Sequence, residues 1–534
     1  MRLVLLGLVL SPALFAQMPA VPVPPENPIT PAKAVLGKML FWEEQLSHDD
    51  TMACATCHMP KAGGGDLRLG RHPGVDGQWN TSDDRFASPG VLRSDAQRRY
   101  MRDPVFGFTP QVTRRASPSN LGAAAYASLL FWDGRASGTF KDPLSGQTAI
   151  QTGGALESQA LGPILDAAEM GHPGRSWAQV TAKVQAARPM ALATNLPADV
   201  TTALTGAPDY PELFRRAFGD PAITPVRIAF AIATYQRTLI PDQTPWDAYQ
   251  RGNQNALTLN QAYGWTRFQG AGCTACHVPP LFTDHSFRNI GLRPIAEDTG
   301  RQEVTGLAGD RGRFKVATLR NVALKTSHMH SGHLENLNWV MEHYEGHTQW
   351  HLDNIDPMFL ALQLSSFDRP ALLDFLTNGL TDPRVKAETA PFDRPTLRSE
   401  RAPNREYGVG TAGAGGLVPL VLGQQPAFVG ALGFRIGLGG GLGGAPALLV
   451  LAAAAFEPPV YVGAIPVNVD PALSVVLPLT LNGTGAGTGA ATAVLPIAND
   501  PALRNALLFT QGFVADALAP GSVAASRAVE FRVQ

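Results

Sequence analysis

Two short stretches, Cys54-Ala55-Thr56-Cys57-His58 and Cys273-Thr274-Ala275-Cys276-His277, determine what this chain folds around. In each, two thiols separated by two residues can form thioether bonds to the vinyl groups of a haem, and the next His can bind its iron. All four cysteines of the chain lie in these stretches, so none remains for a structural disulfide. The sequence therefore predicts two covalently bound haems of the c type.

Paired cysteines also occur in zinc ribbons and in thioredoxin-like redox pairs. Zinc does not require a His directly after the second Cys of both pairs, and the redox motif normally occurs once, near a βαβ pattern. We therefore expect the four thiols to attach haem and the two histidines to bind iron. The expected attachment residues are Cys54, Cys57, Cys273 and Cys276, and the expected iron ligands are His58 and His277.

Residues 1–16 have the layout of a cleavable secretory signal: Met-Arg, an apolar run from Leu3 to Leu10, then Ser-Pro and a small residue at Ala16. The run is far shorter than the roughly 20 residues of a membrane span, and no later stretch is better, so we expect no transmembrane segment. We expect a mature protein that begins near Gln17 and is periplasmic or secreted. A net charge of -1 without a long basic run gives no sign of nucleic-acid binding.

The length of 534 residues suggests about three domains. We predict a mainly α fold with two cytochrome c-type haem domains, at 28–210 and 222–395, and an accessory domain at 405–534. Sheet content should be low in the haem domains. Apolar residues at three- and four-residue spacing predict helices at 177–187, 223–239, 260–268 and 334–344.

The composition changes after about Arg401: Gly and Ala become frequent, and no Lys occurs beyond Lys386. Short apolar runs at 447–455, 475–481 and 493–497, broken by turn residues, favour a β-sandwich, although the run 447–455 could instead be helical. The segment has neither Cys nor His, so it offers no catalytic constellation. Attachment, sorting or partner binding are its candidate roles, and a low-complexity spacer is the alternative.

Several further strings occur in a specific order and spacing. They are Phe131-Trp132-Asp133-Gly134-Arg135-Ala136, Leu156-Glu157-Ser158-Gln159-Ala160, Glu169-Met170-Gly171, Phe314 to Leu324, and Met329-His330-Ser331-Gly332. Together with the haem motifs, they resemble the bacterial di-haem cytochrome c peroxidase and MauG family over roughly residues 30–395. The resemblance implies an oxidoreductase that reduces hydrogen peroxide. A rubber-oxygenase-like di-haem oxygenase and a non-catalytic electron-transfer cytochrome are the alternatives.

The resemblance also implies the catalytic residues. Gln159 and Glu169, ten residues apart, match a family pair on the distal side of the first haem. Glu169 would move protons to and from peroxide, and Gln159 would orient it. Trp132 matches the family Trp that relays electrons between the haems. His72, 14 residues after His58, is either a distal ligand that leaves the iron on activation or an exposed loop residue.

The sixth ligand of the second haem separates the branches of the family. The position 14 residues after His330 is Tyr344, whereas the conventional peroxidases have Met there and the MauG branch has Tyr. Tyrosinate is a hard anion that favours higher oxidation states of iron, so it favours a MauG-like enzyme. Met329, Met341 and His343 compete on spacing, and Tyr344 could instead be a core aromatic.

Calcium and the reaction partners follow from the resemblance alone. The family holds calcium between the haems, partly through an Asn that is missing from Arg115-Ala116-Ser117-Pro118, so calcium stays open, with Asn120 as a substitute ligand. A second region of that site reads Lys325-Thr326-Ser327-His328. The expected partners are hydrogen peroxide and either an electron donor, a small cytochrome or cupredoxin, or an oxidisable substrate. A Gly-rich insertion at about 137–154 departs from the family and is expected to be a surface loop.

Overall fold

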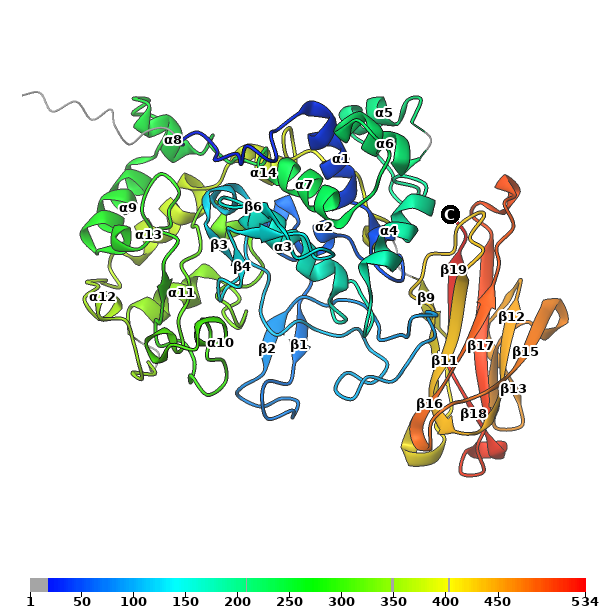
Figure 1. Ribbon diagram of the computed structural model, residues 1–534. Coiled ribbons are helices and arrows are strands. Elements are labelled where there is room, and N and C mark those ends of the chain that lie inside the picture. The colour runs from blue at the N-terminus through cyan, green and yellow to red at the C-terminus, as the bar shows by residue number, and fades with distance from the viewer. Residues whose placement is uncertain (1–17, 208, 347–349, 402–403) are drawn as a thin grey trace, which may run out of the picture.

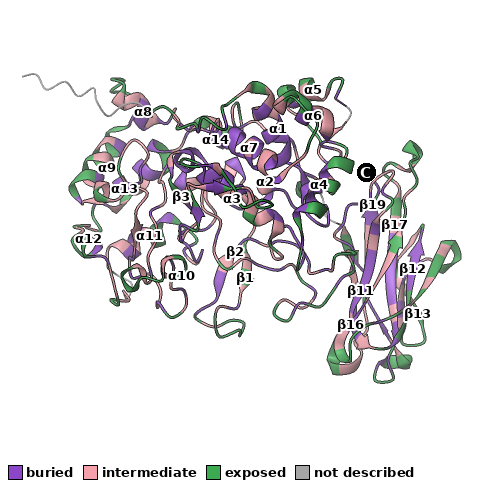
Figure 2. Ribbon diagram, in the orientation of Figure 1, coloured by how far each residue is buried: buried purple, intermediate pink, exposed green. Residues whose placement is uncertain are grey.

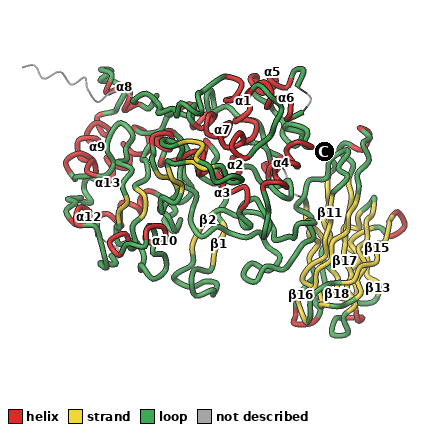
Figure 3. The backbone as a smooth tube through the Cα atoms, in the orientation of Figure 1, coloured by secondary structure: helices red, strands yellow, loops and turns green. Residues whose placement is uncertain are grey.

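The computed structural model describes residues 18–207, 209–346, 350–401 and 404–534. The predicted secretory signal lies outside the described residues. A helix-rich part is followed by a C-terminal region made of strands, which stands beside it (Figure 1, Figure 3). In the described part of the chain, no helix is both long and apolar enough to cross a membrane.

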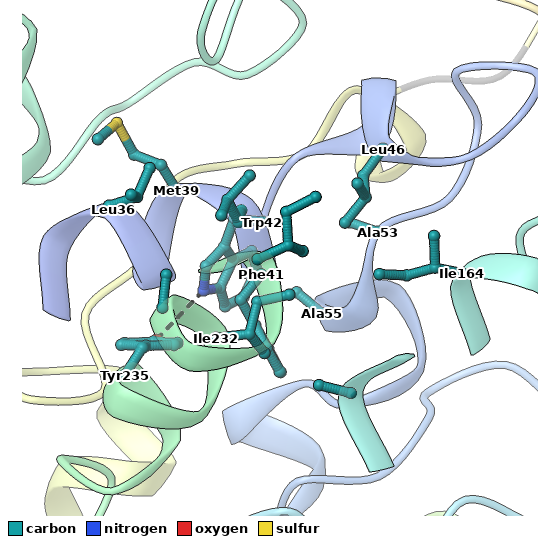
Figure 4. Close-up of a cluster of buried hydrophobic side chains, with 14 of the residues drawn as sticks. Leu36, Met39, Phe41, Trp42, Leu46, Ala53, Ala55, Ile164, Ile232 and Tyr235 are labelled. Atoms are coloured by element: carbon teal, nitrogen blue, oxygen red, sulfur yellow. Dashed lines mark hydrogen bonds between the residues drawn. The ribbon is translucent and has the colours of Figure 1, made fainter. Parts of the chain in front are cut away.

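The first seven α-helices of the described chain build the first core. They are α1 (Pro31–Phe41), α2 (Cys54–Cys57), α3 (Ala155–Leu165), α4 (Trp177–Ala186), α5 (Ala198–Leu204), α6 (Tyr210–Phe218) and α7 (Pro225–Gln236). Helix α1 crosses α7 closely because Gly37 leaves no side chain against the carbonyl of Ala231. Trp42 donates its indole N–H to the hydroxyl of Tyr235 at 3.2 Å within this core (Figure 4).

The helices that follow are α8 (Pro245–Gln250), α9 (Leu259–Gly270), α10 (Gln302–Thr305), α11 (Leu337–Tyr344), α12 (Pro357–Leu360), α13 (Arg369–Asp374) and α14 (Pro383–Ala387). Of these, α8, α9, α11 and α13 contribute to a second core beside the second haem motif, whereas Val385 of α14 belongs to the first core. Aromatic rings pack together inside the second core, with the ring of Trp246 4.9 Å from that of Phe282. The buried Arg320–Asp247 ion pair, at 2.7 Å, fixes the start of α8 to the turn that precedes Val322.

The predicted helices at 177–187, 223–239, 260–268 and 334–344 are confirmed as α4, α7, α9 and α11. Their first residues are set by side-chain caps: Thr224 before α7 accepts from the Arg227 amide, and Thr258 before α9 accepts from the Gln261 amide. The first core is built from segments far apart in the sequence. Helix α7 packs on α1, and Phe392 and Leu397, which follow α14, also belong to this core. The predicted domain limits stay a prediction.

Sheet content in the helix-rich part is low, as predicted, and consists of short antiparallel pairs. The strands are β1 (Gly70–His72) with β2 (Arg85–Ala87), β3 (Leu129–Leu130) with β4 (Ala136–Ser137), β5 (Phe140–Lys141) with β6 (Thr148–Ile150), and β7 (Phe287–Arg288) with β8 (Phe314–Lys315). The Gly-rich insertion contains the β5–β6 pair, which buries Phe140 and Ile150 against α7. Part of the insertion therefore belongs to a small core.

The C-terminal region consists of antiparallel strands. They are β9 (Arg405–Tyr407), β10 (Leu420–Leu422), β11 (Phe434–Gly443), β12 (Pro446–Ala452), β13 (Ala455–Val462), β14 (Ile465–Val469), β15 (Ser474–Thr480), β16 (Gly485–Leu495), β17 (Leu507–Ala515), β18 (Val523–Ala525) and β19 (Ala528–Arg532). One sheet has the order β10-β11-β16, another β15-β12-β17-β19-β9 with β18 beside β17, and β13 pairs with β14. The run 447–455, left open between strand and helix, begins in β12 and is not helical.

Buried side chains from β11, β12 and β19 form one core of this region, including Phe434, Ile436, Leu449 and Phe531. Much of β11, β12 and β17 is buried, while β13 and β15 are largely exposed (Figure 2). The predicted sheet content is therefore confirmed, and the assignment to the sandwich class stays a prediction.

Candidate active site

The first haem motif forms α2, and His58 follows directly at its C-terminal end. The Nδ1 atom of His58 lies 3.0 Å from the carbonyl oxygen of Gly64. When Nδ1–H donates to that carbonyl, Nε2 keeps the lone pair that an iron ligand needs. Burial lowers the pKa of His58, which favours the neutral ring. The backbone turn at Gly63 and Gly64, both with positive φ, thus orients the His58 ring.

The second motif repeats this arrangement without a full helix. His277 places Nδ1 3.1 Å from the carbonyl oxygen of Phe282, and burial lowers its pKa as well. Phe282 has positive φ and is fully buried among aromatic rings, so its carbonyl is held firmly. Both histidines are therefore oriented by a backbone carbonyl five or six residues farther along the chain.

Each motif opens onto a large cavity. The first cavity, with about 1610 Å³ not filled by protein atoms and partly open to solvent, is lined by residues that include Cys57, His58, His72, Trp132, Gln159 and Glu169. The second cavity is also partly open to solvent, with about 1800 Å³ not filled by protein atoms, and its lining residues include Cys273, Cys276, His277, Trp132, Met341 and Tyr344. Most predicted site residues therefore gather at two places.

The residues around the cavities fit covalently bound haem. None of the four cysteines pairs in a disulfide, so all four sulfur atoms are available for attachment, and burial raises the pKa of the Cys54 thiol to about 12 and that of the Cys273 thiol to about 11. Within the described ranges, no three His, Cys, Asp or Glu side chains gather as a metal site, so the two pairs do not form a zinc ribbon. Each pair instead stands beside a His and a cavity.

Glu169 lies in the turn after α3 and faces the first cavity. Burial, with a smaller contribution from the charge of Asp166, raises its pKa to about 7, and the positive charge of Arg135 opposes the shift. The turn is fixed because Asp166 Oδ1 accepts from the amides of Ala168 at 2.8 Å and Glu169 at 3.1 Å. Near neutral pH, Glu169 can therefore both accept and donate a proton.

Gln159 projects from α3 into the same cavity as Glu169. A buried ion pair anchors this helix to α7: Arg237 contacts Glu157 at 2.7 and 3.0 Å. Asn27 adds a further hydrogen bond to Glu157 at 2.8 Å. The predicted pair of Gln and Glu is thus brought together on the side wall of one cavity by a rigid helix and a hydrogen-bonded turn.

Trp132 lines both cavities. Its indole N–H donates to the carbonyl oxygen of Ala116 at 2.7 Å, and its own carbonyl accepts from the Lys315 amide at 2.8 Å. The ring of His330 approaches it edge-on, with the centroids 6.3 Å apart, and stacks on Phe314. Trp132 therefore stands between the two motifs in a fixed orientation.

Tyr344 ends α11 and lines the second cavity. Burial raises its pKa, and the motif thiols Cys273 and Cys276 are near enough to raise it further. Met329 and Met341 line the same cavity. His343 faces elsewhere, because its Nε2 lies 3.0 Å from the carbonyl oxygen of Ile290 and its ring stacks on Phe359.

His72 belongs to β1 and faces the first cavity. Its Nδ1 atom is buried without a hydrogen-bond partner among the described residues, and burial lowers its pKa. The ring of Phe106 meets it edge-on, with the centroids 5.6 Å apart. His72 is therefore not a freely exposed loop residue.

The region expected to hold calcium contains two cations. The Lys325 ammonium donates to the carbonyl oxygen of Ser117 at 3.0 Å, and Arg115 forms ion pairs with Asp298 at 2.6 Å and with Asp133 at 2.5 Å. Calcium binds six to eight oxygen ligands, and an ammonium group on one of the candidate carbonyls opposes it. The buried amide of Asn120 has no hydrogen-bond partner among the described residues. As they stand, these residues do not fit a calcium ion.

A third cavity opens on the surface beside the first one. Its lining includes Arg135, Lys141, Ser137, Thr139 and Ser158, and the two cavities share Phe131, Arg135, Pro163, Asp166 and Glu169. Residues of the insertion and of β4 thus line a surface hollow that adjoins the first cavity at Glu169. Arg135 and Lys325 are site residues with no role predicted from the sequence, because each depends on contacts with residues distant in the chain.

Comparisons with known proteins agree with this geometry. Residues 31–255 match the family model described as di-haem cytochrome c peroxidase. The chain is 31% identical over 337 residues to the methylamine utilization protein MauG of Methylorubrum extorquens, covering 62% of this chain and 74% of that protein. It is 28% identical over 359 residues to a cytochrome c551 peroxidase of Nitrosomonas europaea, covering 65% of this chain and 85% of that protein.

Among solved structures, a MauG-like protein associated with microbial copper homeostasis shares the fold. Its TM-score is 0.51 at 23% identity, covering 71% of this chain and 97% of that one. Two haem motifs, two cavities and these relatives lead to one conclusion: the chain belongs to the di-haem cytochrome c peroxidase family.

Proposed function

We propose that this protein is a MauG-like di-haem c peroxidase that reduces hydrogen peroxide beside His58 and relays electrons or oxidising equivalents through Trp132 to the second haem. One observation carries the proposal: His58, Gln159, Glu169 and Trp132 face one cavity, and Trp132 also faces the cavity of His277. A haem bound at His58 would supply the redox centre at which the oxygen–oxygen bond is cleaved.

Glu169 is the proposed acid and base. Reduction of one hydrogen peroxide to two waters consumes two electrons and two protons. With a pKa of about 7, the Glu169 carboxylate takes a proton from the incoming peroxide and returns it to the departing oxygen. The Gln159 side-chain amide, on the same wall, holds peroxide by hydrogen bonding while this proton moves.

Trp132 is the proposed relay. It lines both cavities, and its hydrogen bond to Ala116 fixes the plane of the indole ring. A rigid aromatic ring between the two redox sites gives electrons a path that a flexible aliphatic side chain would not. Substrate or donor can then exchange electrons near the second motif without entering the first cavity.

The MauG-like branch rests on Tyr344 as sixth ligand of the second haem. Burial raises the pKa of the free phenol, so binding as a hard anion requires loss of its proton to solvent or to a base. Replacing Tyr344 with Met should raise the reduction potential of the second haem, measured by spectroelectrochemistry. An unchanged potential would instead favour Met341 or Met329 as the ligand.

A second candidate is oxygenation of an organic substrate at the first haem. The surface cavity favours it, because that cavity reaches Glu169 and offers room and polar groups for a molecule larger than peroxide. Consumption of dissolved oxygen by the reduced protein, without peroxide, would support this candidate. A passive electron-transfer cytochrome would react with neither oxidant.

The surroundings of the reaction also belong to the proposal. The secretory layout of residues 1–16 supports export to the periplasm or beyond. There a small cytochrome or cupredoxin would donate electrons near the second motif, or an oxidisable substrate would take their place. The division into two haem domains and a C-terminal β-sandwich accessory domain completes the proposed organisation.

One experiment tests the proposal: rapid mixing of the di-ferric holoprotein with one equivalent of hydrogen peroxide, followed in the visible and near infrared. We expect immediate loss of the high-spin absorption band and a long-lived oxidised state of the protein. Reaction only after reduction of one haem would indicate a conventional peroxidase. Absence of reaction in both states would overturn the peroxidase assignment.

A further inference from the structure

The loop formed by residues 92–108 packs against the C-terminal sheet region, in addition to the segment that joins the two parts, where Arg398 donates to the carbonyl oxygen of Gln424 at 2.9 Å. Leu92, Tyr100 and Phe108 of this loop share a buried cluster with Leu422 of β10 and Ala490 of β16. The backbone amide of Tyr100 donates to Thr492 Oγ1 at 2.9 Å. In Figure 1 the loop reaches from the side of β1 and β2 to the sheet that contains β11 and β16.

Glycines of β11 make this contact possible. A side chain at Gly437 would begin 2.5 Å from the Tyr100 ring, and one at Gly439 would begin 3.0 Å from the Phe108 ring. The cross-strand partners of these glycines in β16 are Thr492 and Ala490, which contact the same loop. The Gly-rich face of β11 is thus shaped to receive two aromatic rings of the helix-rich part.

The other end of the loop reaches the first cavity. Phe106 lies in a tight turn in which Asp103 and Gly107 exchange backbone hydrogen bonds at 2.7 and 3.0 Å. The Asp103 carboxylate accepts from the Phe106 amide at 2.9 Å and from Arg93 at 3.0 Å. Between Tyr100 and Phe108, which are both buried against the sheet, this turn therefore has little freedom to move.

Phe106 and His72 both line the first cavity, and their rings meet edge-on. Phe106 also contacts Trp79 edge-on, with the centroids 5.9 Å apart. The Nδ1 atom of His72 is buried without a partner among the described residues, so ring packing carries much of the positioning of this side chain. Any displacement of Phe106 would open space beside His72.

We propose that the C-terminal sheet region positions Phe106, and through it His72, at the wall of the first haem cavity. Tyr100, Phe108 and Thr492 act as positioning residues in this proposal. The inference relies on the proposed function only for the identity of the first cavity as the reacting one. It gives the C-terminal region a role at the site itself instead of, or besides, attachment to a partner.

The test uses the full-length holoprotein and two readouts that do not depend on peroxide turnover. The rate of hydrogen exchange in peptides that cover residues 101–110 measures how readily the loop opens. The rate of cyanide binding to the ferric protein measures access to the first cavity. The variants are Tyr100→Ala, Thr492→Val and Phe106→Ala. The controls are Tyr100→Phe, which keeps the ring, and Tyr461→Ala on β13, where the side chain is 59% exposed.

We expect Tyr100→Ala to accelerate exchange at 101–110 by about tenfold or more, because the ring it removes is buried. Thr492→Val should accelerate exchange at 101–110 by a smaller factor. If Tyr100→Ala does not fold, the result for Thr492→Val tests the proposal in its place. Both variants should change the cyanide rate in the same direction as Phe106→Ala, whereas Tyr100→Phe and Tyr461→Ala should behave like the parent protein.

Two results would overturn the proposal. In one, Phe106→Ala changes the cyanide rate while Tyr100→Ala and Thr492→Val leave exchange and cyanide binding unchanged. In the other, Phe106→Ala itself leaves cyanide binding unchanged. A protein that shows the expected pattern but ignores peroxide would refute the proposed function and leave this inference standing.

Discussion

The guanidinium of Arg135 lies over the ring of Phe131, with 3.6 Å between the Arg135 Cζ atom and the ring centroid. This pair stands where the surface cavity meets the first haem cavity, and Glu169 lines both. An ion pair with Asp133 at 2.9 Å also holds Arg135. A fixed positive charge thus faces the carboxylate that we propose as acid and base.

Replacing Arg135 with Gln should move the pH dependence of the peroxide reaction. Arg135 lowers the pKa of Glu169, so its removal raises that pKa, and the carboxylate form appears only at higher pH. The acid limb of the rate profile, measured by stopped-flow absorption, should shift upward. Arg135→Lys should shift it less because the charge is kept. A downward shift would show that Arg135 does not act on Glu169.

Replacing Trp132 with Phe should uncouple the two haems. The ring that lines both cavities becomes smaller, and the Ala116 carbonyl loses its donor, which costs about 1–3 kcal/mol of folding stability. We expect peroxide to react at the first haem at a nearly unchanged rate while oxidation of the second haem slows. Freeze-quench EPR measures both events. Equal rates at the second haem in variant and parent would remove Trp132 from the relay.

Treatment with a calcium chelator should leave the protein unchanged. Lys325 donates to the Ser117 carbonyl, and Arg115 is paired with two carboxylates. Two positively charged side chains therefore lie in the region that the family resemblance assigns to calcium. Metal analysis should find iron without stoichiometric calcium, and EDTA should alter neither the absorption spectrum nor turnover. One calcium per chain, with loss of turnover on chelation, would contradict this interpretation of Lys325.

Loss of the buried Arg237–Glu157 pair should destabilise the first core. Both side chains are almost fully buried, and Arg237→Ala would leave the Glu157 charge unpaired, at a cost of about 3–5 kcal/mol. Arg215→Ala, at a side chain that is 54% exposed, should cost less than about 1 kcal/mol. Urea unfolding compares the two variants. Similar midpoints would mean that the buried pair contributes little.

The haem motifs and much of the site could be predicted because they depend on local spacing. Two thiols and a His within five residues specify attachment, and Gln159 and Glu169 reach one cavity because a single helix and turn join them. The choice among competing ligands was beyond sequence reasoning. His343 is excluded from the second cavity by the Ile290 carbonyl, a contact 53 residues away in the chain.

Glycine-rich strands were the hardest elements to predict. Residues 434–443 form β11 although glycine weakens isolated strands, and the reason is tertiary: Gly437 and Gly439 receive the rings of Tyr100 and Phe108. The run 493–497 was expected as a short strand, yet β16 begins at Gly485 because it pairs along most of β11. The contact that accounts for these glycines joins residues more than 300 positions apart, such as Tyr100 and Thr492, and leaves no local pattern.

The most direct test of the account is the peroxide reaction of Glu169→Gln as a function of pH. The parent rate should rise with pH through about 7 as Glu169 ionises, because its raised pKa leaves it protonated below that value. The variant, with both haems bound, should react about 100- to 10,000-fold more slowly and without this pH dependence. A variant that reacts as fast as the parent, with the same pH profile, would contradict the central role of Glu169.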